Sequence, residues 1–135
     1  MYPHVFKWPT LLKLGLPYLI FFFTPIVGSL IAIGILIMTD VYTGVRAAQT
    51  RGEEIHSRGL SRTVTKIIFY ALAILLSRMV EIVFIPWLPV SQITAGYIGV
   101  VEFKSNMENI GTITGIDLWN ALKETIENTF KRNIK

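Results

Sequence analysis

Residues 14–39 read LGLPYLIFFFTPIVGSLIAIGILIMT, a run of 26 residues without a charge. A helix needs about 20 apolar residues to cross a hydrocarbon core of about 30 Å, so this run is long enough by itself. A helix in the core of a soluble protein seldom stays apolar on every side over such a length. The run therefore predicts a membrane-spanning segment.

Two prolines, Pro17 and Pro25, leave the path of this segment open. At about 1.5 Å per residue the run would extend about 39 Å, which is long for one upright span and too short for two. Either one tilted, kinked helix crosses the membrane, or a hairpin turns at Thr24 and Pro25. A secretory signal is disfavoured, because its apolar region is only about 7–15 residues long and precedes a small-residue cleavage site.

Working outward, a second uncharged stretch of 20 residues covers 82–101. Over the whole chain 52% of residues are hydrophobic and 16% are charged, against about 25% charged in soluble domains. The 135 residues allow one domain. We therefore expect an all-α integral membrane protein with three transmembrane helices, or four if the first run is a hairpin. The expected segments are an interfacial N-terminus (1–13), a first membrane segment (14–39), a basic loop (41–63), a second span (64–85), a third span (88–103) and an amphipathic tail (104–135).

The loop 41–63 indicates which side of the membrane its neighbours face. It carries four arginines against two glutamates, and an excess of Lys and Arg in a short loop marks the cytoplasmic side. With three spans, the C-terminal tail is cytoplasmic as well. We expect the loop to be partly helical before Gly52 and after Ser57.

The tail has an apolar stripe at helical spacing. Its members, three or four residues apart, are Ile116, Trp119, Leu122, Ile126 and Phe130. This pattern predicts an amphipathic helix. The stripe either packs on the other helices or lies on the inner leaflet.

Arg78 and Glu81 are charged residues inside the second predicted span. They are three residues apart and therefore share one helical face. A charge at the centre of a membrane helix costs about 2.5–3.5 kcal/mol on insertion scales, so this face should contact protein or water. Either the two residues neutralise each other near the outer interface, or they line an oligomeric lesion.

Small residues recur in the predicted spans. Such residues let membrane helices approach closely. The candidate packing positions are Gly28, Ala32, Ala95, Gly96 and Gly99.

The sequence offers no catalytic or metal site. Cysteine is absent, which excludes disulfides and thiolate chemistry. His4 and His56 flank the first apolar run on opposite sides. His56 stands beside Ser57, but adjacent residues do not form a nucleophile–base pair on regular structure, and no third orienting group is apparent. A concentrated basic face with aromatic residues, as nucleic-acid binding needs, is also missing. We expect no enzyme activity, cofactor, metal or nucleic-acid partner.

Four local patterns occur in series along the chain. They are DVYTG at 40–44, IHSRGLSRTV at 55–64, EFKSNMEN at 102–109 and ITGIDLW at 113–119. In this order and spacing the chain resembles the phage holin and toxin-secretion holin family, particularly its branch from Bacteroidetes phages and prophages. The resemblance covers roughly residues 26–126.

The resemblance implies a multi-pass protein of the host cytoplasmic membrane. Such a protein would form homo-oligomers in the bilayer and open lesions through which an endolysin, its functional partner, reaches the peptidoglycan. Two other functions remain open: a non-lytic oligomeric scaffold or anchor that recruits a soluble partner, and a small ion channel.

The motif residues also suggest where assembly occurs. Asp40 is expected to mark the inner interface and to cap a turn at Gly44. Polar residues after the third span follow helical spacing and could meet the basic loop of a neighbouring subunit. The candidate assembly residues are Asp40, Thr43, Gly44, Ser57, Arg58, Arg62, Lys66, Glu102, Ser105, Glu108 and Asn109.

Overall fold

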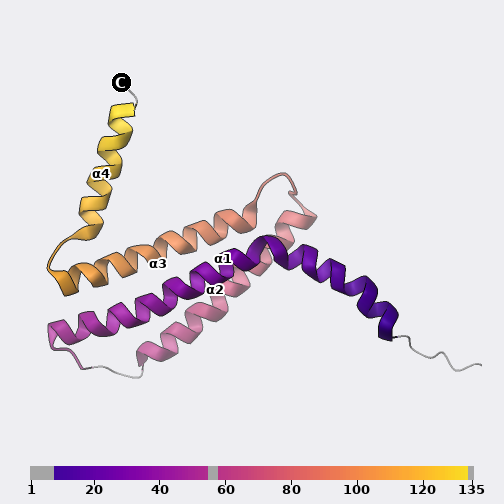
Figure 1. Cartoon of the computed structure of the whole chain (residues 1–135), viewed down its shortest axis with the longest axis horizontal. Coiled ribbons are helices and arrows are strands. Elements are labelled where there is room, and N and C mark those ends of the chain that lie inside the picture. Colours follow the sequence, from indigo (N-terminus) through magenta and orange to yellow (C-terminus); the bar gives the residue numbers. More distant parts are fainter. Residues whose placement is uncertain (1–7, 55–57, 134–135) are drawn as a thin grey trace, which may run out of the picture.

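The computed structural model describes residues 8–54 and 58–133, and within these ranges all regular structure is helical. The helices are α1 (Trp8–Arg51), α2 (Arg58–Val83), α3 (Val90–Thr114) and α4 (Leu118–Asn133). Figure 1 shows the second half of α1 beside α2 and α3, and each pair of these three helices is in contact. The predicted all-α class is confirmed.

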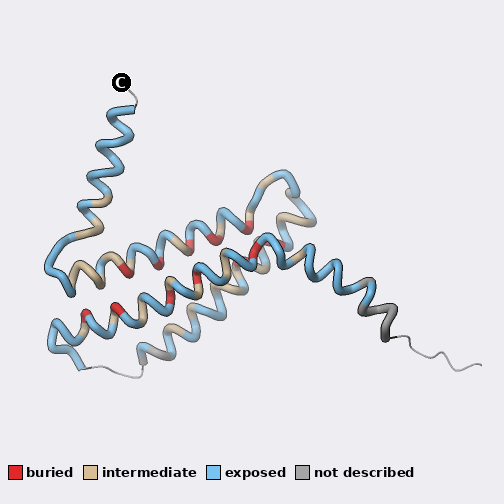
Figure 2. The backbone as a smooth tube through the Cα atoms, in the orientation of Figure 1, coloured by how far each residue is buried: buried red, intermediate tan, exposed pale blue. Residues whose placement is uncertain are grey.

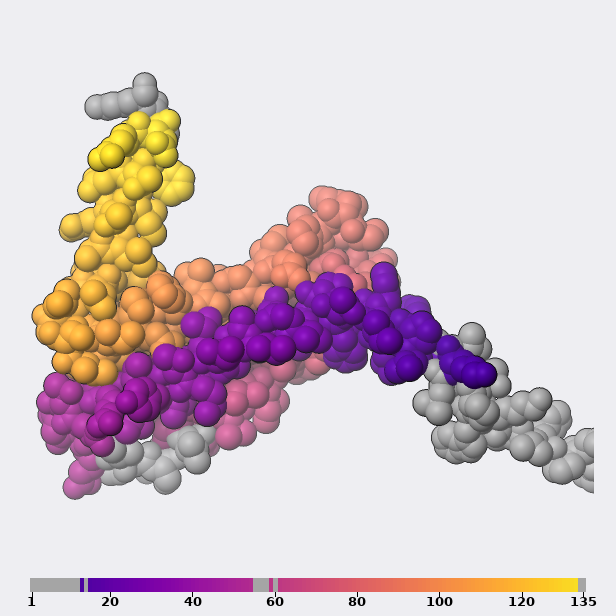
Figure 3. Space-filling model, in the orientation of Figure 1, coloured from indigo at the N-terminus to yellow at the C-terminus, as the bar shows by residue number. Residues whose placement is uncertain are grey.

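The first apolar run forms a single helix, because α1 continues through Pro17 and Pro25. The alternative of a hairpin at Thr24 and Pro25 is therefore wrong. Instead, α1 bends, and its first half leaves the bundle, as Figures 1 and 3 show. Proline is a usual cause of such a bend because it lacks the N–H that would bond four residues back.

Among the described helices, the part of α1 from Gly15 to Arg51 is long and apolar enough to cross a membrane by length and composition. At about 1.5 Å per residue, α2 and α3 are also longer than a hydrocarbon core of about 30 Å. Both carry charged residues along their length, such as Arg78 in α2 and Glu102 in α3. Three crossings therefore stay a prediction.

The core lies between the three bundled helices. Its members recur at helical spacing and are Ile26, Ile33 and Ile37 of α1, Ile74 of α2, and Ala95 and Ile98 of α3. Figure 2 shows the buried residues on the facing sides of the helices. The buried strip on each helix is narrow, because a bundle of three helices encloses little volume.

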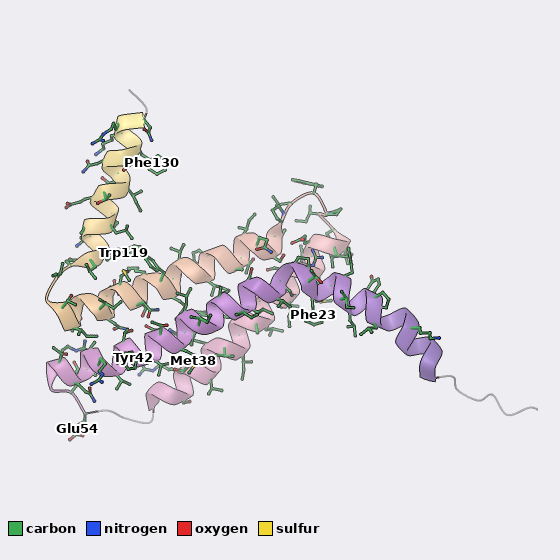
Figure 4. All side chains as sticks on the ribbon, in the orientation of Figure 1. Phe23, Met38, Tyr42, Glu54, Trp119 and Phe130 are labelled. Atoms are coloured by element: carbon green, nitrogen blue, oxygen red, sulfur yellow. The ribbon has the colours of Figure 1, made fainter. Side chains whose placement is uncertain are left out.

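The outside of the bundle is apolar too. Ile35 and Met38 of α1 and Ile68 of α2 are all more than half exposed, and Figure 4 labels Met38 on the outside of α1. In water such an exposed apolar surface would favour aggregation. Aliphatic side chains directed outward are what a helix in hydrocarbon requires.

The loop between α1 and α2 begins at Gly52, whose φ of 72° places it in the left-handed region. The helical segment before Gly52 was predicted and is confirmed, since α1 ends at Arg51. Arg51 donates to the carboxylate of Glu53 at 2.6 Å, and this hydrogen bond lowers the pKa of Glu53. Ser57 lies outside the described residues, as does the side chain of Arg58.

Gly44 does not open a turn, and that prediction is wrong. It lies within α1, and a Cβ there would be 3.5 Å from Nδ2 of Asn109. This is an ordinary van der Waals distance, so Gly44 borders α3 without the close approach that would require a glycine.

The other small residues divide into two groups. Ala95 is buried in the core, and a Cβ on Gly99 would meet Cδ1 of Leu36 at 4.0 Å. Gly28, Ala32 and Gly96 are exposed on the bundle. Packing within the chain therefore uses only Ala95 and Gly99 of the predicted positions.

A tight corner joins α3 to α4. Gly115 adopts φ 73° and its N–H donates to the carbonyl of Gly111 at 2.8 Å, which caps α3. α3 thus continues well beyond the predicted end of the third span at Phe103. Asp117 then caps α4 by accepting from the backbone N–H of Asn120 at 3.1 Å.

Substituting Gly111 should damage this corner. A Cβ at Gly111 would lie 2.8 Å from the carbonyl oxygen of Ile116. We expect Gly111→Ala to lower the free energy of unfolding by about 1–3 kcal/mol, the usual cost of overpacking. Gly96→Ala in the same helix is the control, because nothing lies within 4 Å of its added Cβ. It should be neutral or stabilising by up to about 1 kcal/mol. Unfolding in mixed micelles, followed by circular dichroism, measures both; equal losses would contradict the assignment.

Candidate functional site

A cluster of polar side chains connects α1, α2 and α3 at one level of the bundle. At its centre, Nζ of Lys66 in α2 donates to Oδ2 of Asp40 in α1 and to Oε2 of Glu102 in α3, both at 3.0 Å. The side chain of Glu102 is fully buried. Its other oxygen accepts from the hydroxyl of Tyr70 at 2.9 Å. One ammonium thus joins three helices.

A second set of hydrogen bonds extends the cluster between α1 and α3. Oδ1 of Asp40 accepts from Ser105 at 2.6 Å and from Nδ2 of Asn109 at 3.0 Å. Nδ2 of Asn106 donates to the carbonyl of Leu36 at 3.0 Å, across to α1. We call the residues of both sets the three-helix cluster. Its members are Asp40, Thr43, Lys66, Tyr70, Glu102, Ser105, Asn106 and Asn109.

Helical spacing explains why α3 can supply four of these groups. Positions 102, 105, 106 and 109 are separated by three or four residues, so they share one face of α3. On α1, Asp40 and Thr43 continue the stripe that begins with Ile33 and Ile37. The same face of each helix is therefore apolar in the core and polar at this level.

The structure brings together most of the predicted assembly residues, within a single chain. Asp40, Thr43, Lys66, Ser105 and Asn109 meet as described, together with Glu102, and Gly44 borders Asn109. The predicted contact with a neighbouring subunit is untested and stays a prediction. The protomer nonetheless already uses these groups itself.

Two predicted members lie elsewhere. Glu108 faces outward and pairs with Lys104 at 3.4 Å, with both side chains about half exposed. Arg62 is also exposed, and among the described residues it joins no ion pair. At about 100° per residue, Glu108 lies about 120° around α3 from Glu102, so helical spacing already places it off the face shared by Glu102 and Asn109.

Sequence reasoning missed Tyr70 and Asn106 as members of the cluster. Tyr70 lies four residues after Lys66, so both belong to one face of α2. Asn106 lies four residues after Glu102 in the same way. The four-residue spacing in each helix was the sequence signal that could have identified both residues.

A second polar layer surrounds Arg78, near the bend in α1. The guanidinium pairs with Glu81, and it also donates to the carbonyls of Phe22 at 3.2 Å and Phe21 at 3.3 Å. Phe21 lies four residues before Pro25, whose missing N–H leaves that carbonyl without its helical partner. Arg78 therefore supplies a hydrogen bond that the proline removed.

Glu81 and Gln92 complete this layer from the other side. Oε2 of Glu81 accepts from the backbone N–H of Ser91 at 3.0 Å and from its hydroxyl at 2.6 Å, which caps the start of α3. Nε2 of Gln92 donates to the carbonyl of Pro25 at 2.5 Å. The predicted mutual neutralisation of Arg78 and Glu81 is present, together with backbone contacts that the sequence did not indicate.

The buried polar groups of these two layers all have hydrogen-bond partners. Among the described residues, every buried side-chain nitrogen and oxygen has a hydrogen-bond partner. In the same residues no group of three or more histidines, cysteines or carboxylates could hold a metal ion. The arrangement is therefore suited to holding helices together.

A sequence profile described as the bacteriophage holin family matches residues 18–131. The chain belongs to the bacteriophage holin family. The resemblance seen in the four motifs is thereby confirmed, and the match extends it at both ends. Membership implies a membrane protein that oligomerises, and it suggests a non-enzymatic role. Comparison with curated proteins and with solved structures gave no match.

Proposed function

We propose that this holin-family chain oligomerises in the bacterial cytoplasmic membrane and permeabilises it, so that an endolysin is released and the host lyses. The family match carries the proposal. The bundle is compatible with it, because its charged groups are paired inside while its exterior is apolar. A single copy in this form is suited to lipid without opening a path for water.

The proposed topology places α1, α2 and α3 across the bilayer. α1 and α3 run in the same direction beside α2, as Figure 1 shows. The arginine-rich loop 41–63 then lies in the cytoplasm by the excess of basic residues, and so does the end of α3. In this orientation the three-helix cluster lies toward the cytoplasmic end and the Arg78 layer toward the outer end.

A lesion requires polar groups to face water. In the closed bundle the polar side chains of α3 face α1 and α2. If neighbouring copies separate these helices, Glu102 and the side chains on its face become available to line an aqueous path. Intramembrane ionisable residues commonly have this kind of role.

Inducible expression with a membrane-potential dye tests the proposal. We expect abrupt, timed depolarisation, followed by lysis only when a cytoplasmic endolysin is produced in the same cells. The control is an equal membrane level of the chain without endolysin, which should depolarise without rapid lysis. Persistent potential and normal growth at a high membrane level would overturn the proposal and leave a non-lytic scaffold.

A further inference from the structure

The rest of the described chain covers only the first part of the apolar stripe of α4, where Trp119 and Leu122 are half-buried. None of its residues is buried, and among the described elements it contacts only α3. Ile126 and Phe130 are 47% and 64% exposed. Packing on the other helices, one of the two arrangements that the sequence allowed, therefore applies only to the start of the stripe and leaves its second half exposed.

The direction of α4 is set by its corner. The capped Gly115, the close approach at Gly111 and the Asp117 cap hold the connection. Nζ of Lys104 in α3 also lies 6.0 Å from the ring centre of Trp119, a cation–π contact across the corner. Figure 1 shows α4 running across the direction of α3 and leaning back over it, so in an upright bundle α4 extends sideways from the end of α3 and slopes toward the bilayer.

The stripe also faces the correct side. Figure 4 shows Phe130 projecting from α4 on the side that overlooks the length of α3, where the proposed bilayer begins. Glu124 and Lys131 lie on other parts of the helical circumference. Lys123, seven residues before Phe130, borders the stripe, where a lysine extends its ammonium toward the headgroups. An apolar side toward lipid and a charged side toward water is the arrangement of an interfacial helix.

The height of α4 fits this position. Glu108 is exposed, so its carboxylate must lie outside the hydrocarbon. From Glu108 to Thr114, α3 rises about 9 Å, and helical side chains reach back about 5 Å from the axis of α4. The polar layer of a bilayer is about 5–8 Å thick on each side, so the stripe, about 4 Å outside the level of Glu108, lies within this layer.

We infer that α4 is an interfacial helix whose partner is the lipid surface of the cytoplasmic leaflet, with Leu122, Ile126 and Phe130 turned toward the acyl chains and Trp119 at the headgroup level beside Lys104. Residues 116–133 carry three acidic and three basic side chains. Insertion is therefore driven by apolar burial and does not require anionic lipid. The inference rests on the proposed topology and does not depend on whether the chain lyses cells.

Spin labels at single cysteines test the inference cleanly, because the chain has no cysteine of its own. Leu122→Cys and Ile126→Cys place labels on the stripe, while Glu124→Cys and Asn128→Cys place matched labels on the opposite side. The full chain is reconstituted in phosphatidylcholine vesicles, with and without phosphatidylglycerol. Collisions of each label with oxygen, which concentrates in lipid, and with a water-soluble nickel complex are then measured.

We expect the two stripe labels to collide more with oxygen and the two opposite labels to collide more with the nickel complex. The same difference should be found with and without phosphatidylglycerol. If all four labels are accessible to the nickel complex, α4 lies in water and the inference is overturned. Stripe labels shielded from both reagents would overturn it in favour of a protein partner, such as a second copy. Leu72→Cys, on the exposed surface of α2, should favour oxygen and reports separately whether the bundle is inserted.

Discussion

Glu102→Leu is expected to lower the free energy of unfolding by about 1–3 kcal/mol, the usual cost of leaving a buried polar group without its hydrogen-bond partner. The substitution removes the acceptor of both Lys66 and Tyr70 at a side chain with no solvent exposure. Lys66 would keep Asp40, but Tyr70 would keep a hydroxyl without its partner. Glu102→Gln retains an acceptor oxygen and should cost less. Unfolding in mixed micelles of dodecylmaltoside and dodecyl sulfate measures each change.

Glu108→Gln is the matched control for Glu102. It removes a carboxylate from the same helix, where the only described partner is Lys104 at 3.4 Å on an exposed surface. Exposed pairs of this kind contribute about 0.3–0.5 kcal/mol, so the change should be close to the error of the measurement. If Glu108→Gln and Glu102→Gln lower the free energy of unfolding equally, Glu102 does not hold the helices together as described.

The long apolar helix could be predicted from sequence because it depends on composition alone. The uncharged run 14–39 predicted a helix able to cross a membrane, and apolar spacing predicted the helix at the C-terminus. The limits of the bundle could not be predicted in the same way. α1 and α3 extend past the uncharged runs 14–39 and 82–101, and beyond these runs they continue to pack on each other through polar contacts such as Asp40 with Ser105.

The three-helix cluster was only partly predictable. Its residue types and approximate level followed from the motifs, yet the partners of each residue depend on how the helices are rotated about their axes. Glu102 and Glu108 are both acidic and lie near one another in sequence, but one is fully buried and the other exposed. Whether Lys66 serves its own chain or a neighbour is likewise a matter of tertiary packing.

The contact between Arg78 and α1 was beyond sequence reasoning for a different reason. Its acceptors are the main-chain carbonyls of Phe21 and Phe22, and main-chain groups leave no signature in the residue types. Pro25 gave a signal that a carbonyl would be free. Which donor would reach it, from 57 residues away, could only come from the fold.

Arg78→Met is therefore expected to cost about 3–5 kcal/mol of unfolding free energy, since it leaves Glu81 buried without its cation. The side chain of Arg78 is 7% exposed and that of Glu81 is 14% exposed. Arg78→Lys separates the two roles of the guanidinium. A lysine retains a charge for Glu81 but lacks the planar set of donors that reaches two carbonyls as well, so its cost should be intermediate.

Pro25→Ala provides the decisive comparison, because alanine restores the N–H that bonds to the carbonyl of Phe21 within α1. In that background Arg78 is no longer the donor on which this carbonyl depends. Arg78→Met should then cost about 1–2 kcal/mol less than it does in the parent, a coupling of the size found between residues in contact. Additive costs, within about 0.5 kcal/mol, would show that Arg78 and Pro25 act independently. The coupling is what connects the bend in α1 to the charged layer in α2.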